Sequence, residues 1–274
     1  STRVRSSAAS DVYKRQLEAQ LLDFKILFAY HSNKIENQNT DYHDTRDIFE
    51  KGKVSNYTGD LRTLFEIQNQ KDCYHFLLDK IIDKVPLSIP LIKKIHYELS
   101  KGTYDSYRYD MNHERPGEFK KHDYITGKYE VGSYPENVES DLQELLEEIN
   151  EYEGEDVFTV ASYLHACFEN IHPFADANGR TGRTIMNYYL LIHNVSPIII
   201  YEEDRKEYYN CLEKFDVDSE LQPLKDFIIR QQEKTWTRNS KKAMKLNEIM
   251  NKDENQNTFE MNDIEESNDE MELE

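Results

Sequence analysis

The sequence HPFADANGRTGR, residues 172–183, decides how the rest of this chain is interpreted. Residues 184–193 follow it with apolar side chains at helical spacing and no proline, so they predict a helix that begins beside this run. The first N–H groups of a helix lack partners within it and carry partial positive charge. A turn of small residues at such a helix start can therefore wrap closely around an anion.

The polar side chains of this run suit a nucleotide triphosphate. Arg180 and Arg183 lie three residues apart, so one helical turn can aim both guanidinium groups at phosphate oxygens. Asp176 offers the hard oxygen ligand that Mg²⁺ takes when it also binds phosphates. His172 is largely neutral near pH 7 and can accept a proton from an attacking hydroxyl. Together these residues predict a site for nucleotidyl transfer from ATP with Mg²⁺.

The run resembles the signature of the Fic family, H-x-F-x-D/E-G-N-G-R-x-x-R, and departs from it at Ala177. Alanine is nearly as small as glycine, so we expect the turn to form, although a positive φ there would cost free energy. The related Doc-like branch, which phosphorylates its targets, shares this alanine but replaces Gly179 with lysine and lacks the last arginine. Because Gly179 and Arg183 are both present, the resemblance favours the AMP-transferring branch.

The resemblance implies transfer of AMP from ATP to a Ser, Thr or Tyr hydroxyl of a protein, with release of pyrophosphate. His172 is then the general base, Phe174 seats the loop, and Asp176 holds Mg²⁺ between the α- and β-phosphates. The motif residues expected to contact the nucleotide are Asp176, Ala177, Asn178, Gly179, Arg180, Gly182 and Arg183. Among these, Asn178 and Gly179 would cradle the α-phosphate, Arg180 the β-phosphate and Arg183 the γ-phosphate.

Two further assignments concern the surroundings of the run. Tyr208 and Tyr209, together with Arg205, fall where the family often packs against adenine, and core tyrosines are the alternative. His165, on the predicted helix that enters the run, is expected to be structural rather than catalytic.

A second element of the family is an inhibitory helix with the pattern S/T-x-x-x-E-G/N, which Ser32, Glu36 and Asn37 resemble. In the family the glutamate of this helix pairs with the last motif arginine, here Arg183. A carboxylate in that place occupies the position that a γ-phosphate needs and repels the triphosphate, so we expect weak basal activity. The flanking residues that also resemble the N-terminal variant of this arrangement are Ile35, Thr40 and Gly52.

Residues 117–134 are rich in glycine and aromatic residues, and Thr126-Gly127 at their centre predicts a β-hairpin. The resemblance makes this hairpin a flap that covers the nucleotide and pairs with an extended segment of a target protein. An ordinary surface hairpin is the alternative. Self-AMPylation is a related expectation, because exposed members of the 19 tyrosines could serve as acceptors.

Apart from this hairpin the sequence predicts one all-α domain of the Fic type. Helical periodicity appears in residues 12–30, 61–82, 88–100, 138–152, 157–171, 181–193 and 221–237. The expected organisation is a non-native or disordered leader (1–10), an N-terminal region with the inhibitory helix (11–55), a Fic core (56–240) and a disordered acidic tail (241–274). The composition of the tail cannot offset the entropy of ordering it.

Net charge and cysteine usage bear on the partners and the compartment that we expect for this chain. The formal net charge is −19, from 34 Lys and Arg against 53 Asp and Glu, and it disfavours binding to nucleic-acid backbones. Cys73, Cys167 and Cys211 are widely spaced without metal-ligand pairing, which favours a reduced, cytoplasmic protein. No apolar run is long enough to span a bilayer, so we expect no membrane partner.

Other functions stay open at this level. The same fold could use another donor, such as UTP or a choline-linked nucleotide, or it could remove AMP with a water that Glu36 positions. A non-catalytic nucleotide-sensing module is disfavoured because a binder needs no base such as His172. A toxin of a toxin–antitoxin pair is disfavoured because the inhibitory element already lies in the chain. The sequence identifies neither the target protein nor the oligomeric state.

Overall fold

Helices build the part of the chain that the computed structural model describes, residues 7–124 and 132–237. In chain order they are α1 (Ser7–Glu36), α2 (Tyr42–Lys51), α3 (Leu61–Ile82), α4 (Ile89–Ser100), the π-helix η1 (Tyr107–Met111), α5 (Val138–Glu151), α6 (Val157–Ile171), α7 (Asn178–Ile192), the 3₁₀ helix η2 (Glu202–Asp204), α8 (Arg205–Asp218) and α9 (Gln222–Thr237). These residues contain no strand, which confirms the all-α prediction. The turn of the predicted hairpin, around Thr126-Gly127, lies outside the described residues.

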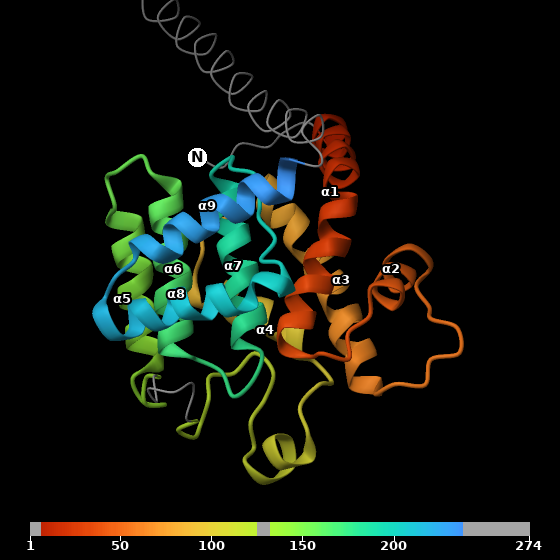
Figure 1. Cartoon of the computed structure of the whole chain (residues 1–274), viewed down its shortest axis with the longest axis horizontal. Coiled ribbons are helices and arrows are strands. Elements are labelled where there is room, and N and C mark those ends of the chain that lie inside the picture. Colours follow the sequence, from red (N-terminus) through yellow and green to blue (C-terminus); the bar gives the residue numbers. More distant parts are fainter. Residues whose placement is uncertain (1–6, 125–131, 238–274) are drawn as a thin grey trace, which may run out of the picture.

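Helix α7 is the centre of the fold. It packs against α6 on one side and against α1, α3 and α4 on the others (Figure 1). Every residue from Arg180 to Ile192 is buried, and a helix buried all round belongs to the core of a protein. The first turns of α7 belong to the motif run, so its polar side chains are carried into the interior.

The other helices form two flanks around α7 (Figure 1). On one flank α1 packs along α3, and α2 contacts both of them. On the other flank α5 packs against α6, and α9 crosses α6 and α8. The end of α1 and the start of α3 are thereby held near the start of α7.

Side chains fix where several of these helices begin. Asp60 accepts a hydrogen bond from the N–H of Arg62 at the start of α3, and Ser88 accepts one from the N–H of Leu91 in α4. Such caps satisfy N–H groups that have no partner within the helix. The cap at Asp60 sets the position of Arg62, which bears on the site described below.

The predicted helices all have counterparts, with differences at some boundaries. Helix α1 begins at Ser7, inside the expected leader, and continues beyond residue 30 to Glu36. Helix α7 begins at Asn178 rather than at residue 181, and α2 and α8 lie outside the predicted set. Within the described residues no helix is long and apolar enough to cross a lipid bilayer. The expected acidic tail lies outside the described part of the chain.

Gly182 determines how closely α6 and α7 approach. A Cβ atom at this position would meet the Glu169 carboxyl oxygen and would lie 3.1 Å from both His165 Nδ1 and Phe168 Cδ1. We predict that Gly182→Val lowers the free energy of unfolding by roughly 1–3 kcal/mol, because the added atoms overpack the contact. Urea denaturation followed by circular dichroism measures this change.

The control is Glu144→Val, at an exposed position of α5, which reports the lower helix propensity of valine alone. An equal loss of stability in both variants would contradict this role of Gly182.

Candidate active site

A polar cavity of about 580 Å³ lies where the start of α7 meets the end of α1 and the start of α3. The sequence-predicted residues that line it are Glu36, Asn37, His172, Asp176, Ala177, Asn178, Gly179 and Arg180. The lining also includes Tyr124 of the predicted flap, and three residues that the sequence analysis did not identify, namely Arg62, Glu66 and Arg108. These come from distant parts of the chain, and no local sequence pattern marks them.

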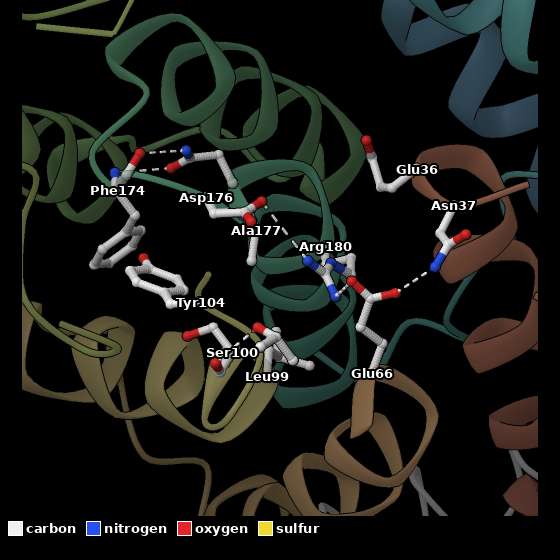
Figure 2. Close-up of polar contacts among 12 residues, drawn as sticks. Glu36, Asn37, Glu66, Leu99, Ser100, Tyr104, Phe174, Asp176, Ala177 and Arg180 are labelled. Carbon is white, nitrogen blue, oxygen red and sulfur yellow. Dashed lines mark hydrogen bonds and ion pairs between the residues drawn. The ribbon is translucent and has the colours of Figure 1, made fainter. Parts of the chain in front are cut away.

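The loop between α6 and α7 is held in shape by the side chain of Asn178. Its Oδ1 accepts a hydrogen bond from the N–H of Phe174 (2.9 Å), and its Nδ2 donates one to the carbonyl oxygen of Phe174 (2.7 Å; Figure 2). The Phe174 ring stacks on His96 with 3.7 Å between ring centroids. The amide of Asn178 is therefore used within the loop, and the expectation that Asn178 and Gly179 cradle the α-phosphate stays a prediction.

Two residues of this loop adopt left-handed backbone conformations. His172 has φ 50° and ends α6, and Ala177 has φ 61° and precedes the first residue of α7. This finding explains why the family pattern carries glycine at the position of Ala177, since a left-handed residue with a side chain costs about 1–2 kcal/mol. The turn forms with alanine, as expected.

His172 is set up to act as a base. Burial, together with the positive charge of Lys120, lowers its pKa to about 4. The imidazole is therefore neutral near pH 7 and has a lone pair to accept a proton. His172 lies on the cavity wall.

Asp176 carries its charge into the cavity. Burial alone would raise the pKa of this carboxyl, but the guanidinium groups of Arg180 and Arg62 outweigh burial and hold the pKa below its usual value. Oδ2 accepts a hydrogen bond from Arg62 Nη2 (2.7 Å), and Oδ1 lies 3.8 Å from Arg180 Nη2 (Figure 2). The carboxylate is thus ionised and surrounded by cations.

The start of α7 supplies donors for an anion. The N–H groups of Asn178, Gly179 and Arg180 have no partner within the helix, because each lies in its first turn. Arg180 is buried, with Nη1 3.2 Å from Glu66 Oε1. Its Nε and Nη1 make no hydrogen bond to the described residues. These groups form a cationic cradle of the kind that binds phosphate.

Arg183 pairs with the predicted inhibitory element. Its Nη2 donates to Glu36 Oε1 (2.8 Å) and to the Ser32 carbonyl oxygen (3.0 Å), and its Nε donates to Ser32 Oγ (3.1 Å). The Arg183 side chain is 1% exposed and Glu36 is 33% exposed, so the carboxylate lies between the arginine and the cavity. A Cβ at Gly179 would collide with Glu36, so glycine there is what lets the carboxylate approach.

Four predicted nucleotide contacts do not line the cavity, namely Arg183, described above, and Gly182, Tyr208 and Tyr209. Gly182 lies in the contact between α6 and α7. Tyr208 is fully buried and its hydroxyl lies 2.8 Å from Nε2 of His165, so the core alternative holds for this tyrosine and His165 is structural. Tyr209 is 38% exposed, with the Arg205 guanidinium 5.3 Å from its ring centroid, outside the cavity lining.

Segments on either side of the undescribed part of the predicted flap attach to the catalytic loop. The N–H of Lys120 donates to the Pro173 carbonyl oxygen, and the N–H of Ser133 donates to the Ile171 carbonyl oxygen, each at 2.9 Å. Lys120 and Ser133 are therefore held beside the residues that flank His172 on either side.

The donor set suits a magnesium ion that is bound together with phosphates. In the described part of the chain no three His, Cys, Asp or Glu side chains gather around a common point, so the protein offers no complete metal cage. One ionised carboxylate facing a polar cavity is what Mg²⁺ uses when phosphate oxygens and water supply its remaining ligands. Asp176 fits that role.

These features define a helical domain with an anion-binding loop at the start of its central helix. Residues 86–190 match the Fic/DOC family. The adenylyltransferase Fic of Drosophila persimilis is 28% identical over 212 residues, covering 75% of this chain and 39% of that protein. The Drosophila mojavensis protein of the same name is 30% identical over 155 residues, covering 54% of this chain and 30% of that protein.

Solved structures share the fold. A Fic-domain signalling protein from Bacteroides thetaiotaomicron superposes with a TM-score of 0.73 at 22% identity, covering 84% of this chain and 90% of that one. Fic-1 from C. elegans superposes with a TM-score of 0.65 at 21% identity, covering 85% and 72%. The chain spans about two fifths of the length of the Drosophila persimilis relative (39%).

The left-handed conformation of Ala177 gives a stability prediction. We predict that Ala177→Gly raises the free energy of unfolding by about 0.5–1 kcal/mol, because glycine relieves the φ strain but loses more chain entropy on folding. Thermal denaturation measures the gain. The same substitution at Ala161, inside α6, is the control and should destabilise the protein. A loss of stability in Ala177→Gly would contradict the strain argument.

The Glu169 carboxyl gives a pH prediction. Its Oε1 is buried without a hydrogen-bond partner among the described residues, and burial raises the pKa of Glu169 from 4.5 to about 8. Unfolding between these pH values releases its proton, so its contribution to stability is full below pH 4.5 and is lost as the pH rises toward 8. Glu169→Gln removes this titration.

We therefore predict that the stability of Glu169→Gln relative to wild type rises by about 2–3 kcal/mol between pH 6 and pH 8. Urea denaturation at both pH values measures it, with Glu144→Gln at an exposed site as the control. A difference that does not change with pH would show that Glu169 does not titrate in this range.

Proposed function

We propose that this chain is a protein adenylyltransferase that moves AMP from ATP to a hydroxyl of a protein and is held inactive by Glu36. The observation that carries the proposal is the shared cavity. It joins His172, Asp176 and the start of α7 on one side with Glu36, paired with Arg183, on the other. The likeness to proteins named adenylyltransferase supports the same reaction.

The chemistry assigned to the chain's own residues is simple. The N–H groups of α7 and the Arg180 guanidinium bind the phosphates, and Asp176 would hold Mg²⁺, which neutralises phosphate charge when bound. The neutral His172 removes the proton from the acceptor hydroxyl. The new bond joins the hydroxyl oxygen to the α-phosphorus, the bond to the β-phosphate oxygen breaks, and pyrophosphate leaves with the electron pair.

Inhibition follows from the contacts of Arg183. This arginine is the natural partner for the terminal phosphate of ATP, but Glu36 and Ser32 already use its Nη2 and Nε. A bound triphosphate would have to displace the Glu36 carboxylate and would be repelled by its charge. If this contact favours the inactive state by about 3 kcal/mol, the active fraction falls roughly a hundredfold.

We predict that Glu36→Gly increases AMP transfer roughly ten- to hundredfold, because Arg183 becomes free to bind phosphate. Intact-mass spectrometry after incubation with ATP and Mg²⁺ measures the transfer through the mass of one added adenylyl group on the chain itself. The double variant Glu36→Gly with His172→Ala should show no gain, because it lacks the base.

Parallel incubation with UTP tests the alternative donor, since a uridylyl group adds a different mass. Circular dichroism checks that each variant is folded. Equal modification of wild type and Glu36→Gly would exclude the inhibitory role of Glu36, and modification that survives His172→Ala would exclude His172 as the base.

A further inference from the structure

Both carboxylate oxygens of Asp176 are engaged within the protein. Oδ1 accepts a hydrogen bond from the N–H of Ala177 at 2.7 Å. Oδ2 accepts one from Nη2 of Arg62 at 2.7 Å. Oδ2 is the oxygen without a backbone partner, so it is the one that a metal ion would use, and a guanidinium group lies against it.

Arg62 is held on Asp176 by its own second contact. Its Nε donates to Glu66 Oε1 (3.0 Å), so one planar guanidinium group bridges two carboxylates. Glu66 is 3% exposed, and its Oε2 accepts a hydrogen bond from Asn37 Nδ2 at 2.9 Å (Figure 2). Arg62 is therefore tied through Glu66 to Asn37, the residue that follows the end of α1.

Arg62 also has the freedom to leave this position. Its side chain is 35% exposed and lines the cavity, whereas Arg180 beside it is 3% exposed. The guanidinium can therefore move into the cavity without crossing packed side chains. A partly exposed guanidinium keeps part of its hydration, so it gives way at lower cost than a fully buried one even though its partners Glu66 and Asp176 are largely buried.

We propose that Arg62 is a latch on Asp176, and that it must leave Oδ2 before a divalent cation can bind there. The inference rests on the proposed function, because it takes Asp176 as the metal ligand. Mg²⁺ and Mn²⁺ bind carboxylate oxygens more closely than an N–H group does, and the positive charge of Arg62 repels them at that range.

This latch is separate from the contact between Glu36 and Arg183. The two contacts share no residue, and they act on different parts of the nucleotide. Glu36 opposes a terminal γ-phosphate, whereas Arg62 opposes the metal ion. ADP has no γ-phosphate, so the binding of ADP with Mn²⁺ reports on Arg62 with little influence from Glu36.

The experiment measures Mn²⁺ affinity of the whole chain in the presence of saturating ADP, from the electron paramagnetic resonance signal of free Mn²⁺. We expect Arg62→Gln to bind Mn²⁺ about five- to tenfold more tightly than wild type, in line with the net contribution of a typical hydrogen bond. Circular dichroism confirms that the variants are folded.

Arg108→Gln is the matched control. Arg108 also lines the cavity, but its Nε donates to the Ala175 carbonyl oxygen and its Nη1 pairs with Asp105 rather than with Asp176. It removes the same charge without removing a contact to the carboxylate. The latch predicts that Arg62→Gln binds Mn²⁺ at least about threefold more tightly than Arg108→Gln does. Equal affinities in these two variants would overturn it.

Asp176→Asn separates failure of the latch from failure of the proposed function. In the Arg62→Gln background this change should remove the gain in Mn²⁺ affinity. If it lowers the affinity but Arg62→Gln alone does not raise it, Asp176 is the metal ligand and the latch is wrong. If Asp176→Asn leaves the affinity unchanged in both backgrounds, the assignment of the metal ligand fails, and the latch fails with it.

Discussion

The arrangement of this site depends on the cost of burying two positive charges. Helix α7 carries Arg180 and Arg183 into the interior, where they are 3% and 1% exposed. A buried guanidinium that loses water must find anionic or hydrogen-bonding partners in the protein. Glu66 from α3 meets Arg180, and Glu36 from α1 meets Arg183. The buried arginines thus explain why the ends of α1 and α3 converge on the start of α7.

These partners leave some N–H donors of the two arginines without hydrogen bonds. Nε and Nη1 of Arg180 and Nη1 of Arg183 are buried and make no hydrogen bond within residues 7–124 and 132–237. Unsatisfied buried donors are costly, and in a native protein they commonly mark a place where a ligand or water completes the set. A phosphate group offers several acceptor oxygens and a larger charge than one carboxylate. The same requirement that pairs Arg183 with Glu36 therefore favours an anionic ligand at the donors that remain.

The sequence predicted those parts of the molecule that depend on short-range pattern. Helical spacing located most of the helices, and the motif run brought His172, Asp176 and Arg180 to one loop, which the structure places on one cavity. It did not predict α2, which buries only Thr45 and Ile48 and so shows no apolar stripe. Spacing also could not reveal which motif side chains point away from the cavity.

Contacts between residues far apart in the sequence could not be predicted from local sequence patterns. Arg62 and Asp176 are 114 residues apart, and nothing near Arg62 distinguishes it from other charged residues at a helix start. Tyr208 shows the converse problem, because a tyrosine near a predicted site looks the same in sequence whether its ring faces a ligand or the core. Only packing decides, and here the tyrosine is fully buried beside His165.

The strong negative charge of the chain is compatible with a nucleotide site and disfavours an extended nucleic-acid surface. At physiological ionic strength, exposed charges more than about 8 Å apart are largely screened. A mononucleotide inside the cavity therefore responds mainly to the nearby Arg62, Arg108 and Arg180, which line its wall. A nucleic acid would need a continuous basic surface, whereas this chain carries 53 acidic against 34 basic residues. The excess of acidic residues thus restricts anion binding to places where the fold gathers arginines, and the start of α7 is such a place.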